Sequence, residues 1–354
     1  MKRALILASV ASALLFVPAA SCVASTLSVS NPQALYAAVK ASSAGDTILL
    51  RSGDYGVVQL DHLNFPGAGL TVKAAPGAKP VMASLVAKNS KGLNFAGLEI
   101  AMAPKQQYGM FAIQSERISF DNMTAHQADG SLDGVGFFFR LSNRISVTNS
   151  EFHHLGVGGS ALDTPNVTVS NNRFHDINTD GVDLAGSPAA TVTANTFTDF
   201  FPSPGAHPDA IQLWQTKEHP MPAGSVVKDN IIRRGKGRVM QGIFVESQSN
   251  ITIVGNAMSG TMTNGIAVSG TKTADIRDNF VQGYRDMGVR IIARGGSSNI
   301  TVSGNVAPLV VDLRQGNEPG TVNFVENKTS RIRDAAVGDD SAMDAWLAKR
   351  GRKP

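Results

Sequence analysis

The chain has 354 residues, 35 glycines, only 6% aromatic residues and a formal net charge of +4 at pH 7. Four of its basic residues lie together within 349–353, without the interleaved aromatic residues of a nucleic-acid-binding surface. We therefore do not expect nucleic acid as a partner, and the single cysteine, Cys22, excludes internal disulfides as a support for the fold.

The first 24 residues have the pattern of a secretion signal. Lys2 and Arg3 precede an apolar stretch from Ala4 to Pro18, and Cys22-Val23-Ala24 is a small-residue cleavage site. The apolar stretch is too short for a transmembrane helix. We therefore expect a periplasmic or secreted protein without a transmembrane segment. The alternative to cleavage after Ala24 is a lipid anchor on Cys22, which follows an incomplete lipoprotein box.

The next segment predicts a cap on the N-terminal end of a β-structure. Asn31 to Ser42 is expected to form a short helix with Asn31 as its N-cap. Gly45-Asp46-Thr47-Ile48-Leu49-Leu50 and Gly53-Asp54-Tyr55-Gly56 follow. This stretch resembles the cap of secreted β-helix polysaccharide lyases, the family that includes chondroitinase B and alginate lyases, with Ala44 where that family has proline. The resemblance implies an architecture and leaves the chemistry open.

A repeated asparagine predicts the fold of the remaining chain. A column that begins at Asn122 and continues through Ser150 and Asn172 to Asn327 recurs at intervals of 22 to 35 residues, after short β-branched segments such as Ile251-Thr252-Ile253. One short strand per repeat of this length indicates a solenoid. Asparagine tolerates left-handed turns, and stacked asparagines can form a hydrogen-bonded ladder.

We therefore predict an all-β fold, a right-handed parallel β-helix with short helical caps at both ends. The expected organisation is a signal peptide over 1–24, a β-helix domain with its N-terminal cap over 25–330, and a C-terminal helical cap with a basic tail over 331–354. Ser341 to Lys349 is the predicted C-terminal helix, and Trp346 and Leu347 would cover the last coil. We expect a monomer.

A second strand in each coil brings acidic residues together. Alternation along Asp180-Gly-Val-Asp-Leu184 and Asp209-Ala-Ile-Gln-Leu213 directs the fourth residue of each segment outward. One column is then expected to hold Asp180, Asp209 and Gln241, and a second column to hold Asp183, Gln212 and Arg290. Trp214 lies beside this patch as a platform for a sugar ring.

The loops that enter this strand supply further candidates. The coil that contains Asp209 is the longest, and insertions in a solenoid gather on its binding face. The additional candidate residues on these loops and neighbouring turns are His175, His207, Arg233, Arg234, Lys236, Arg238 and Tyr284.

The first functional hypothesis is a lyase or C5-epimerase that acts on an acidic, uronate-containing polysaccharide. Both reactions remove the proton at C5, which requires neutralisation of the adjacent carboxylate. Asp180, Asp183 and Asp209 are the expected ligands of a cation, with Ca²⁺ as the candidate. The base is expected among His207, Lys236, Arg238 and Arg290, with Tyr284 as the acid. The expected substrate-binding residues are His175, Gln212, Trp214, Arg233, Arg234 and Gln241.

Two alternatives remain open at this point. Asn178-Thr179-Asp180-Gly181-Val182-Asp183 resembles the NTDGxD motif of polygalacturonases, which implies a glycoside hydrolase with two retained acids. The chain departs from that family in its next coils, where Pro208-Asp209 replaces a pair of aspartates and Gln241-Gly242 replaces a His-Gly pair. The other alternative is a non-catalytic, polysaccharide-binding β-helix, because a fold alone does not define an activity.

Overall fold

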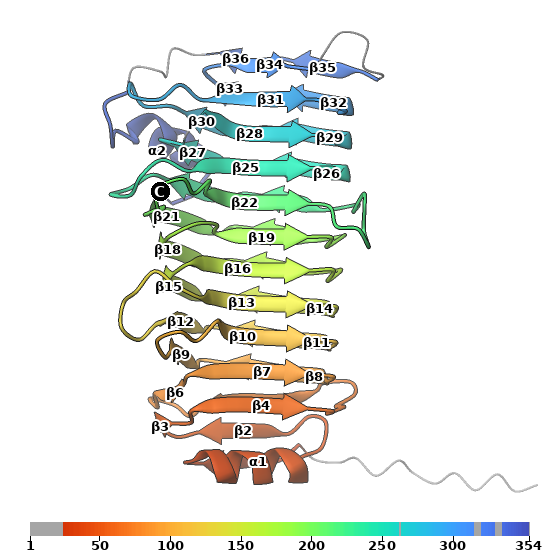
Figure 1. Ribbon diagram of the computed structural model, residues 1–354, viewed down its shortest axis with the longest axis vertical. Helices are drawn as coiled ribbons and strands as arrows, with labels where there is room; N and C mark the ends of the chain where they lie inside the picture. The colour runs from red at the N-terminus through yellow and green to blue at the C-terminus, as the bar shows by residue number, and fades with distance from the viewer. Residues whose placement is uncertain (1–23, 262, 315–319, 330–334, 354) are drawn as a thin grey trace, which may run out of the picture.

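The protein is a tall stack of coils, most of which contribute one strand to each of three parallel sheets (Figure 1). The computed structural model describes residues 24–261, 263–314, 320–329 and 335–353. The predicted signal peptide, except Ala24, and the candidate lipid-anchor residue Cys22 lie outside these residues. The predicted all-β parallel β-helix is confirmed.

Sheet A contains 13 strands in chain order from one end of the stack to the other. Its strands are β1 (Thr26–Val29), β2 (Thr47–Leu50), β5 (Leu70–Ala74), β8 (Lys91–Ala96), β11 (Glu116–Asp121), β14 (Asn143–Thr148), β17 (Thr168–Ser170), β20 (Thr191–Thr193), β23 (Val226–Lys228), β26 (Ser249–Val254), β29 (Lys272–Arg277), β32 (Ser298–Ser303) and β35 (Val322–Val325).

Sheet B contains 12 shorter strands. They are β3 (Gly53–Asp54), β6 (Pro80–Met82), β9 (Glu99–Met102), β12 (Thr124–Gln127), β15 (Glu151–Leu155), β18 (Arg173–Ile177), β21 (Thr196–Phe200), β24 (Ile231–Arg233), β27 (Ala257–Ser259), β30 (Phe280–Gln282), β33 (Val306–Ala307) and β36 (Lys328–Thr329).

Sheet C contains 11 strands and carries the predicted acidic patch on its outer face. They are β4 (Val57–Asp61), β7 (Ser84–Lys88), β10 (Tyr108–Ile113), β13 (Val135–Arg140), β16 (Val157–Leu162), β19 (Val182–Ala185), β22 (Asp209–Trp214), β25 (Gln241–Glu246), β28 (Asn264–Ser269), β31 (Arg290–Arg294) and β34 (Val310–Asp312).

One continuous apolar core fills the interior of the stack because alternate residues of each strand point inward. Inside sheet B, the rings of Phe152, Phe174 and Phe197 stack with centroids 4.9 Å apart. In sheet C, Gly159 leaves the space for the ring of Phe137, since a Cβ there would lie only 2.0 Å from the ring. The chain thus builds its core coil by coil.

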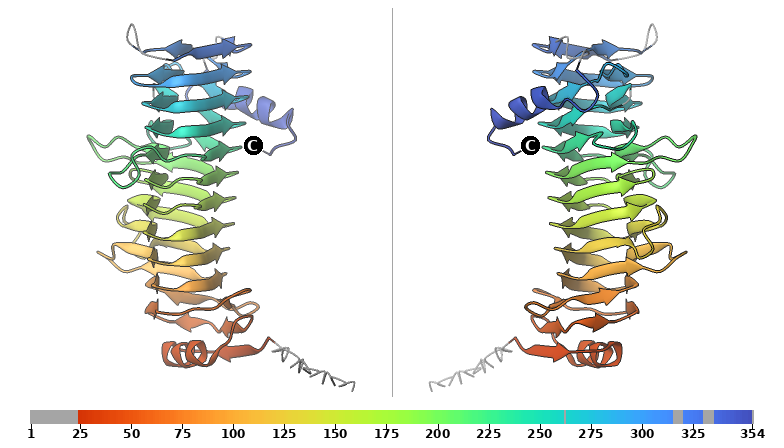
Figure 2. Two further views of the ribbon diagram at one scale, coloured as in Figure 1. Left: turned by 90° about the vertical axis from the view of Figure 1, so that its right-hand side faces the viewer. Right: turned by 90° about the vertical axis from the view of Figure 1, so that its left-hand side faces the viewer.

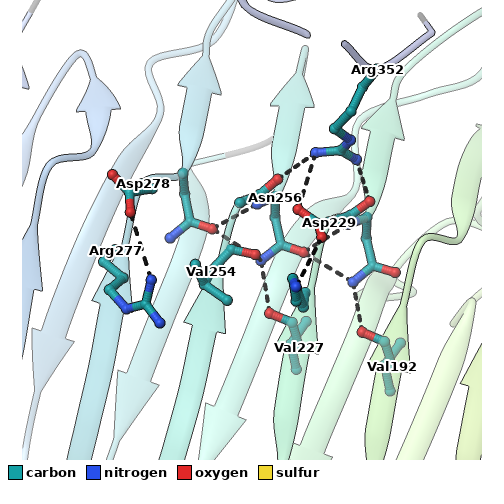
Figure 3. Close-up of polar contacts among 12 residues, drawn as sticks. Val192, Val227, Asp229, Val254, Asn256, Arg277, Asp278 and Arg352 are labelled. Atoms are coloured by element: carbon teal, nitrogen blue, oxygen red, sulfur yellow. Dashed lines mark hydrogen bonds and ion pairs between the residues drawn. The ribbon is translucent and has the colours of Figure 1, made fainter. Parts of the chain in front are cut away.

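The predicted asparagine ladder runs inside the turn between sheets A and B (Figure 3). From Asn172 to Asn305, each side-chain amide donates to the Oδ1 of the asparagine in the next coil at 2.9–3.0 Å. The same Oδ1 also accepts a backbone N–H, and each amide also donates to a backbone carbonyl such as that of Val227, which accepts from Asn256. The ladder therefore satisfies the buried turns.

Two details of the predicted column are wrong. Asn122 lies one residue before the ladder, where its φ is 51°, and Met123 occupies the ladder position. The left-handed residue in these turns is the one that precedes the ladder, such as Asp229 with φ of 55°. Asparagine is therefore selected in the ladder by its two-sided hydrogen bonding, and its tolerance of left-handed dihedrals is not used there.

The N-terminal helix α1 (Pro32–Ala41) covers the first coil, as predicted. The Oδ1 of Asn31 accepts from the backbone N–H of Ala34 at 2.9 Å, so Asn31 is the N-cap. Leu35, Ala38 and Val39 are buried against the end of the stack.

The C-terminal helix α2 (Ser341–Ala348) packs against β27 and β30 on the side of the stack. The prediction that Trp346 and Leu347 cover the last coil is therefore wrong: with Met343, they contact Ala257 and Phe280 several coils earlier. Figure 2 shows α2 on the opposite side from the long loops. Arg352 fixes the tail by donating to the carbonyls of Asp229 and Gly255 (Figure 3).

Candidate functional site

In four successive coils, the strand of sheet C begins with a polar residue: Asp209 in β22, Gln241 in β25, Asn264 in β28 and Arg290 in β31. Asp180, which precedes β19, extends this polar column by one coil. The backbone N–H of Asp209 donates to Asp180 Oδ1 at 2.9 Å, and Gln241 Nε2 donates to Asp209 Oδ1 at 2.8 Å. Asn264 Nδ2 then donates to Gln241 Oε1 at 2.7 Å, and Arg290 Nε donates to Asn264 Oδ1 at 3.2 Å. The column therefore connects two carboxylates to a guanidinium through two amides.

The second outward column places Asp183 next to Gln212, as predicted. Trp214, 39% exposed, donates its indole N–H to Asp183 Oδ1 at 2.7 Å. This bond fixes the ring beside the carboxylate and leaves part of the ring in contact with solvent. An aromatic surface therefore borders the acidic cluster, which we define as Asp180, Asp183 and Asp209.

The electrostatics of the acidic cluster favour bound protons. Burial, together with the negative charge of Asp180, raises the pKa of Asp183 to about 7 and the pKa of Asp209 to about 8. Burial also raises the pKa of Asp180. The cluster thus holds at least one neutral carboxyl group near pH 7, and because the groups are coupled the protons belong to the cluster as a whole.

His207 lies at the open side of this cluster. Its Nδ1 is 3.2 Å from Gln241 Nε2 and 3.9 Å from Asp209 Oδ2, while its side chain is 72% exposed. Arg294, at the end of β31, also acts on the cluster, since its charge lowers the pKa of Asp209 against the dominant effect of burial. Arg294 is held with its guanidinium carbon 5.1 Å from the centre of the Phe244 ring.

The alignment of Arg290 in the second column is wrong. Arg290 pairs with Asn264 in the first column, and Ile292 pairs with Ala267 in the second, because β28 and β31 pair with a local shift in register between Asn264 and Ile266. Arg290 also lines a cavity of about 240 Å³ with Thr263, Gly288, Val289 and Leu309. It therefore lies three coils from Asp209, at the far end of the polar column.

Three other predicted residues do not join the cluster, because they bind charged groups elsewhere. Arg233 forms ion pairs with Asp340 and Asp344 beside α2, and Arg234 is buried against Asp286. The hydroxyl of Tyr284 donates to Asp340 Oδ1 at 2.5 Å, and burial raises its pKa to about 12. Tyr284, which is 1% exposed, is therefore not available as the acid of a reaction at the cluster.

His175 lies in sheet B, where it belongs to a stack of imidazole rings. The ring centres of His126, His153 and His175 are 4.8 and 5.2 Å apart, and His175 Nε2 lies 3.1 Å from Glu151 Oε1. Burial and the neighbouring imidazoles lower the pKa of His153 to about 4. This stack is on a different face from the acidic cluster, so the structure does not support contact between His175 and a substrate there.

Lys236 and Arg238 are exposed on the loop between β24 and β25. The backbone N–H of Lys236 donates to Asp199 Oδ1, and the Arg238 guanidinium donates to the carbonyl of Pro202 at 3.2 Å. Arg238 thus tethers its loop to the insertion that contains His207. Asn264, Phe244 and Arg294 were not among the predicted site residues, although their positions in the strands of sheet C point to this face.

No group of three His, Cys, Asp or Glu residues within the described ranges is arranged to hold a metal ion. The cluster offers carboxylate oxygens, the donor type that Ca²⁺ prefers. One oxygen of each carboxylate already accepts a hydrogen bond, from Asp209 N–H, Trp214 or Gln241. Each carboxylate of the cluster is therefore already held by a donor of the protein through one of its oxygens.

Two protein families match parts of the chain. The family described as "Right handed beta helix region" matches residues 83–207, and the family described as "Periplasmic copper-binding protein (NosD)" matches residues 205–307. No curated protein sequence matches the chain significantly. Together with the three parallel sheets, these matches define the chain as a right-handed parallel β-helix protein.

Solved structures share this fold at low sequence identity. The A-module of the mannuronan C-5 epimerase AlgE4 from Azotobacter vinelandii is 12% identical, with a TM-score of 0.61 over 87% of this chain and 91% of that chain. The GH136 lacto-N-biosidase from Eubacterium ramulus is 15% identical, with a TM-score of 0.62 over 86% and 67%. An alginate lyase from Paenibacillus sp. is 15% identical, with a TM-score of 0.51 over 86% and 99%. The resemblance to β-helix proteins that act on polysaccharides is thus confirmed for the fold.

Proposed function

We propose that the protein is an exported carbohydrate-active enzyme that removes the C5 proton of a uronate in an acidic polysaccharide, as a lyase or a C5-epimerase. The observation that carries this proposal is the acidic cluster beside Trp214, in which burial keeps a carboxyl group neutral. The similar folds of an alginate lyase and a mannuronan epimerase support the substrate class. Within the described residues, no helix has the length and apolarity needed to cross a membrane.

The neutral carboxyl group supplies the first requirement of this chemistry. A protonated Asp183, which is partly exposed, donates a hydrogen bond to the carboxylate of the uronate. This bond withdraws charge from the carboxylate and makes the C5 proton more acidic. A cluster of three ionised aspartates would instead repel an anionic substrate. Gln241 holds Asp209 in place through its amide N–H, and Trp214 offers its ring face to the sugar.

His207 is the best-placed base for the second requirement. Its exposed imidazole takes the C5 proton, and the electrons of the C–H bond move toward the carboxylate. In a lyase these electrons form the C4–C5 double bond, the C4–O4 bond breaks, and O4 takes a proton from the cluster. In an epimerase a proton returns to C5 from the opposite face.

Calcium remains a proposal for this site. Asp180, Asp183 and Asp209 would hold the ion, with the substrate carboxylate as an added ligand, and the ion would neutralise charge. Excess chelator tests this point: a calcium-dependent enzyme loses activity and regains it with added Ca²⁺, whereas an enzyme that uses the neutral carboxyl group keeps its rate.

Hydrolysis is the second candidate, because Asp183 and Asp209 both have raised pKa values on one sheet face and could divide the roles of acid and base. The lacto-N-biosidase with the same fold is consistent with it. Simple binding is the third candidate, since the surface adhesin PfbA of Streptococcus pneumoniae also has this fold at 11% identity and a TM-score of 0.51 over 84% of each chain.

The deciding experiment mixes the purified protein with alginate, pectate, glucuronan and sulfated glycosaminoglycans. A lyase produces an unsaturated uronate that absorbs ultraviolet light; an epimerase changes the proton NMR spectrum without cleavage; a hydrolase releases reducing ends without absorbance. Asp209→Asn should abolish the product, and Asp275→Asn on sheet A is the matched control. Absence of all three products on every polymer would contradict the proposal.

A further inference from the structure

Three aromatic rings lie together on the outer face of sheet C, in coils that precede the acidic cluster. Tyr108 and Phe111 belong to β10, and Phe138 belongs to β13. Their ring centres are 4.9–5.7 Å apart and their planes lie within 10–16° of one another. All three side chains are partly exposed, whereas their neighbours Met110 and Phe137 point inward and are buried. The core therefore does not require these rings.

Two cations border the aromatic rings. Lys88 and Arg140 occupy the next outward positions of β7 and β13, because β7 and β13 both pair with β10 and place these residues on either side of Ile113. Neither cation forms an ion pair with any residue in the described ranges. Asp61 of β4 is the register partner of Lys88, and its Oδ1 lies 2.8 Å from His62 Nδ1. Unpaired cations beside aromatic rings favour an anionic ligand with an apolar face.

The register of sheet C connects this surface to the acidic cluster. Phe138 pairs with Ser160, and Ser160 pairs with Asp183, so only one small side chain separates the last ring from the cluster in this column. Phe138 and Asp183 are two strand spacings apart, with β16 between their strands, which corresponds to about 9.6 Å. Phe111, Phe138 and Asp183 therefore lie in one column parallel to the axis of the stack. The two cations lie in the neighbouring outward column, which continues to Trp214.

We propose that Tyr108, Phe111, Phe138, Lys88 and Arg140 form a second polysaccharide-binding site, which we call the aromatic platform. It binds sugar rings of an acidic polymer against the aromatic side chains and their carboxylates at Lys88 and Arg140. The same polymer chain extends along sheet C to the acidic cluster. The inference rests on the proposed function for the choice of an acidic polymer, and it adds where the chain is held away from the reacting sugar.

Affinity electrophoresis tests the platform without turnover. Asp209→Asn protein is run in native gels that contain alginate or polygalacturonate, with dextran as a neutral polymer. We expect Phe138→Ala and Phe111→Leu to weaken retardation about tenfold and Arg140→Gln about fivefold in at least one acidic gel, as loss of aromatic and charged contacts predicts. Phe324→Ala and Lys73→Ala on sheet A change an exposed ring and an exposed cation far from sheet C, and should leave retardation unchanged.

The outcomes separate the platform from the proposed reaction. Equal retardation of platform and control variants in every gel, or no retardation of the parent protein, would overturn the platform. If the platform variants lose retardation while the unmutated protein gives no product with any polymer, the platform stands and the proposed reaction fails. Turnover of short oligomers should be unchanged by Phe111→Leu, since they do not reach the platform, whereas long oligomers should show a KM raised about tenfold at equal kcat.

Discussion

Two polar ladders run through the same stack of coils and differ in charge. The asparagine ladder between sheets A and B is buried and neutral. Each side chain, such as that of Asn256, donates to the asparagine of the next coil and to a carbonyl of the preceding coil, and its oxygen accepts from the preceding asparagine. The column from Asp180 to Arg290 has the same spacing, but it begins with two carboxylates whose pKa values are raised by burial. One ladder thus satisfies the buried turns of the fold, and the other holds carboxyl groups with raised pKa values, which the proposed function uses.

The largest effect is expected when one ionisable group is removed from the acidic column. Asp209→Asn keeps the shape of the side chain and its hydrogen-bond acceptor, but it cannot exchange a proton. We expect turnover to fall about 1,000-fold, with unfolding at pH 8 shifted upward by about 2 °C. Product assays and thermal melts check both effects. A variant that is both inactive and less stable at pH 8 would mean that Asp209 is mainly structural.

The reverse change tests the neutral ladder. Asn256→Ala removes hydrogen bonds to Asn230, Asn279 and Val227 and leaves buried backbone groups without partners. We expect the free energy of unfolding to fall by about 2–4 kcal/mol, as measured by urea denaturation, with kcat unchanged in the folded protein. Asn323→Ala, at an exposed position of sheet A, is the control and should cost less than about 0.5 kcal/mol.

Trp214 should have a smaller effect, confined to the acidic ladder. Trp214→Phe keeps a ring but removes the N–H that donates to Asp183, whereas Trp214→Ala removes both. We expect Trp214→Ala to raise KM about tenfold and Trp214→Phe about threefold, measured with the polymer that gives product. A change in kcat alone, with KM unchanged in both variants, would exclude Trp214 as a sugar platform.

The last prediction concerns the dependence of stability on pH. The pKa values of Asp183 and Asp209 lie above the ordinary value of 3.8, at about 7 and about 8. Through these two groups the folded state binds more protons than the unfolded state, so their contribution to stability falls as pH rises to about 8. The lowered pKa of His153, about 4 against an ordinary 6.5, has the opposite effect below pH 6.5, so the decline is expected between about pH 6.5 and pH 8. Thermal melts should show this decline in the unmutated protein, and a smaller decline in Asp209→Asn. A stability that rises between about pH 6.5 and pH 8 would contradict the pKa values assigned to Asp183 and Asp209.

The sequence predicted the fold well because a solenoid repeats its pattern in every coil. Local spacing alone predicts the asparagine ladder from Asn172 to Asn327, the N-cap at Asn31, and the pairing of Asp183 with Gln212. Arg290 was misplaced by two residues, and a slip of two residues preserves the alternation of inward and outward side chains. Alternation therefore cannot detect it, and only the pairing of β28 with β31 does.

The remaining errors come from contacts between distant parts of the chain. Arg233 and Tyr284 were assigned to the site because their segments precede strands of sheet C. Asp340, more than 50 residues away from both, binds them instead. The position of α2 on the side of the stack depends on its packing with Ala257 and Phe280, which no local pattern specifies. Charged residues in loops could not be assigned to substrate or to a tail from the sequence.

Because each strand of sheet C pairs only with the strands of the adjacent coils, distances along the sheet increase in steps of one whole coil. The acidic cluster spans the two neighbouring coils of β19 and β22, while Phe138 lies two coils away from the first of them. Inserting one complete coil after β16 would lengthen this interval by about 4.8 Å and keep both ends intact. Under the proposed function, the shortest oligomer that reaches both the aromatic platform and the acidic cluster would lengthen by the same interval, so duplication of a coil would change the preferred chain length.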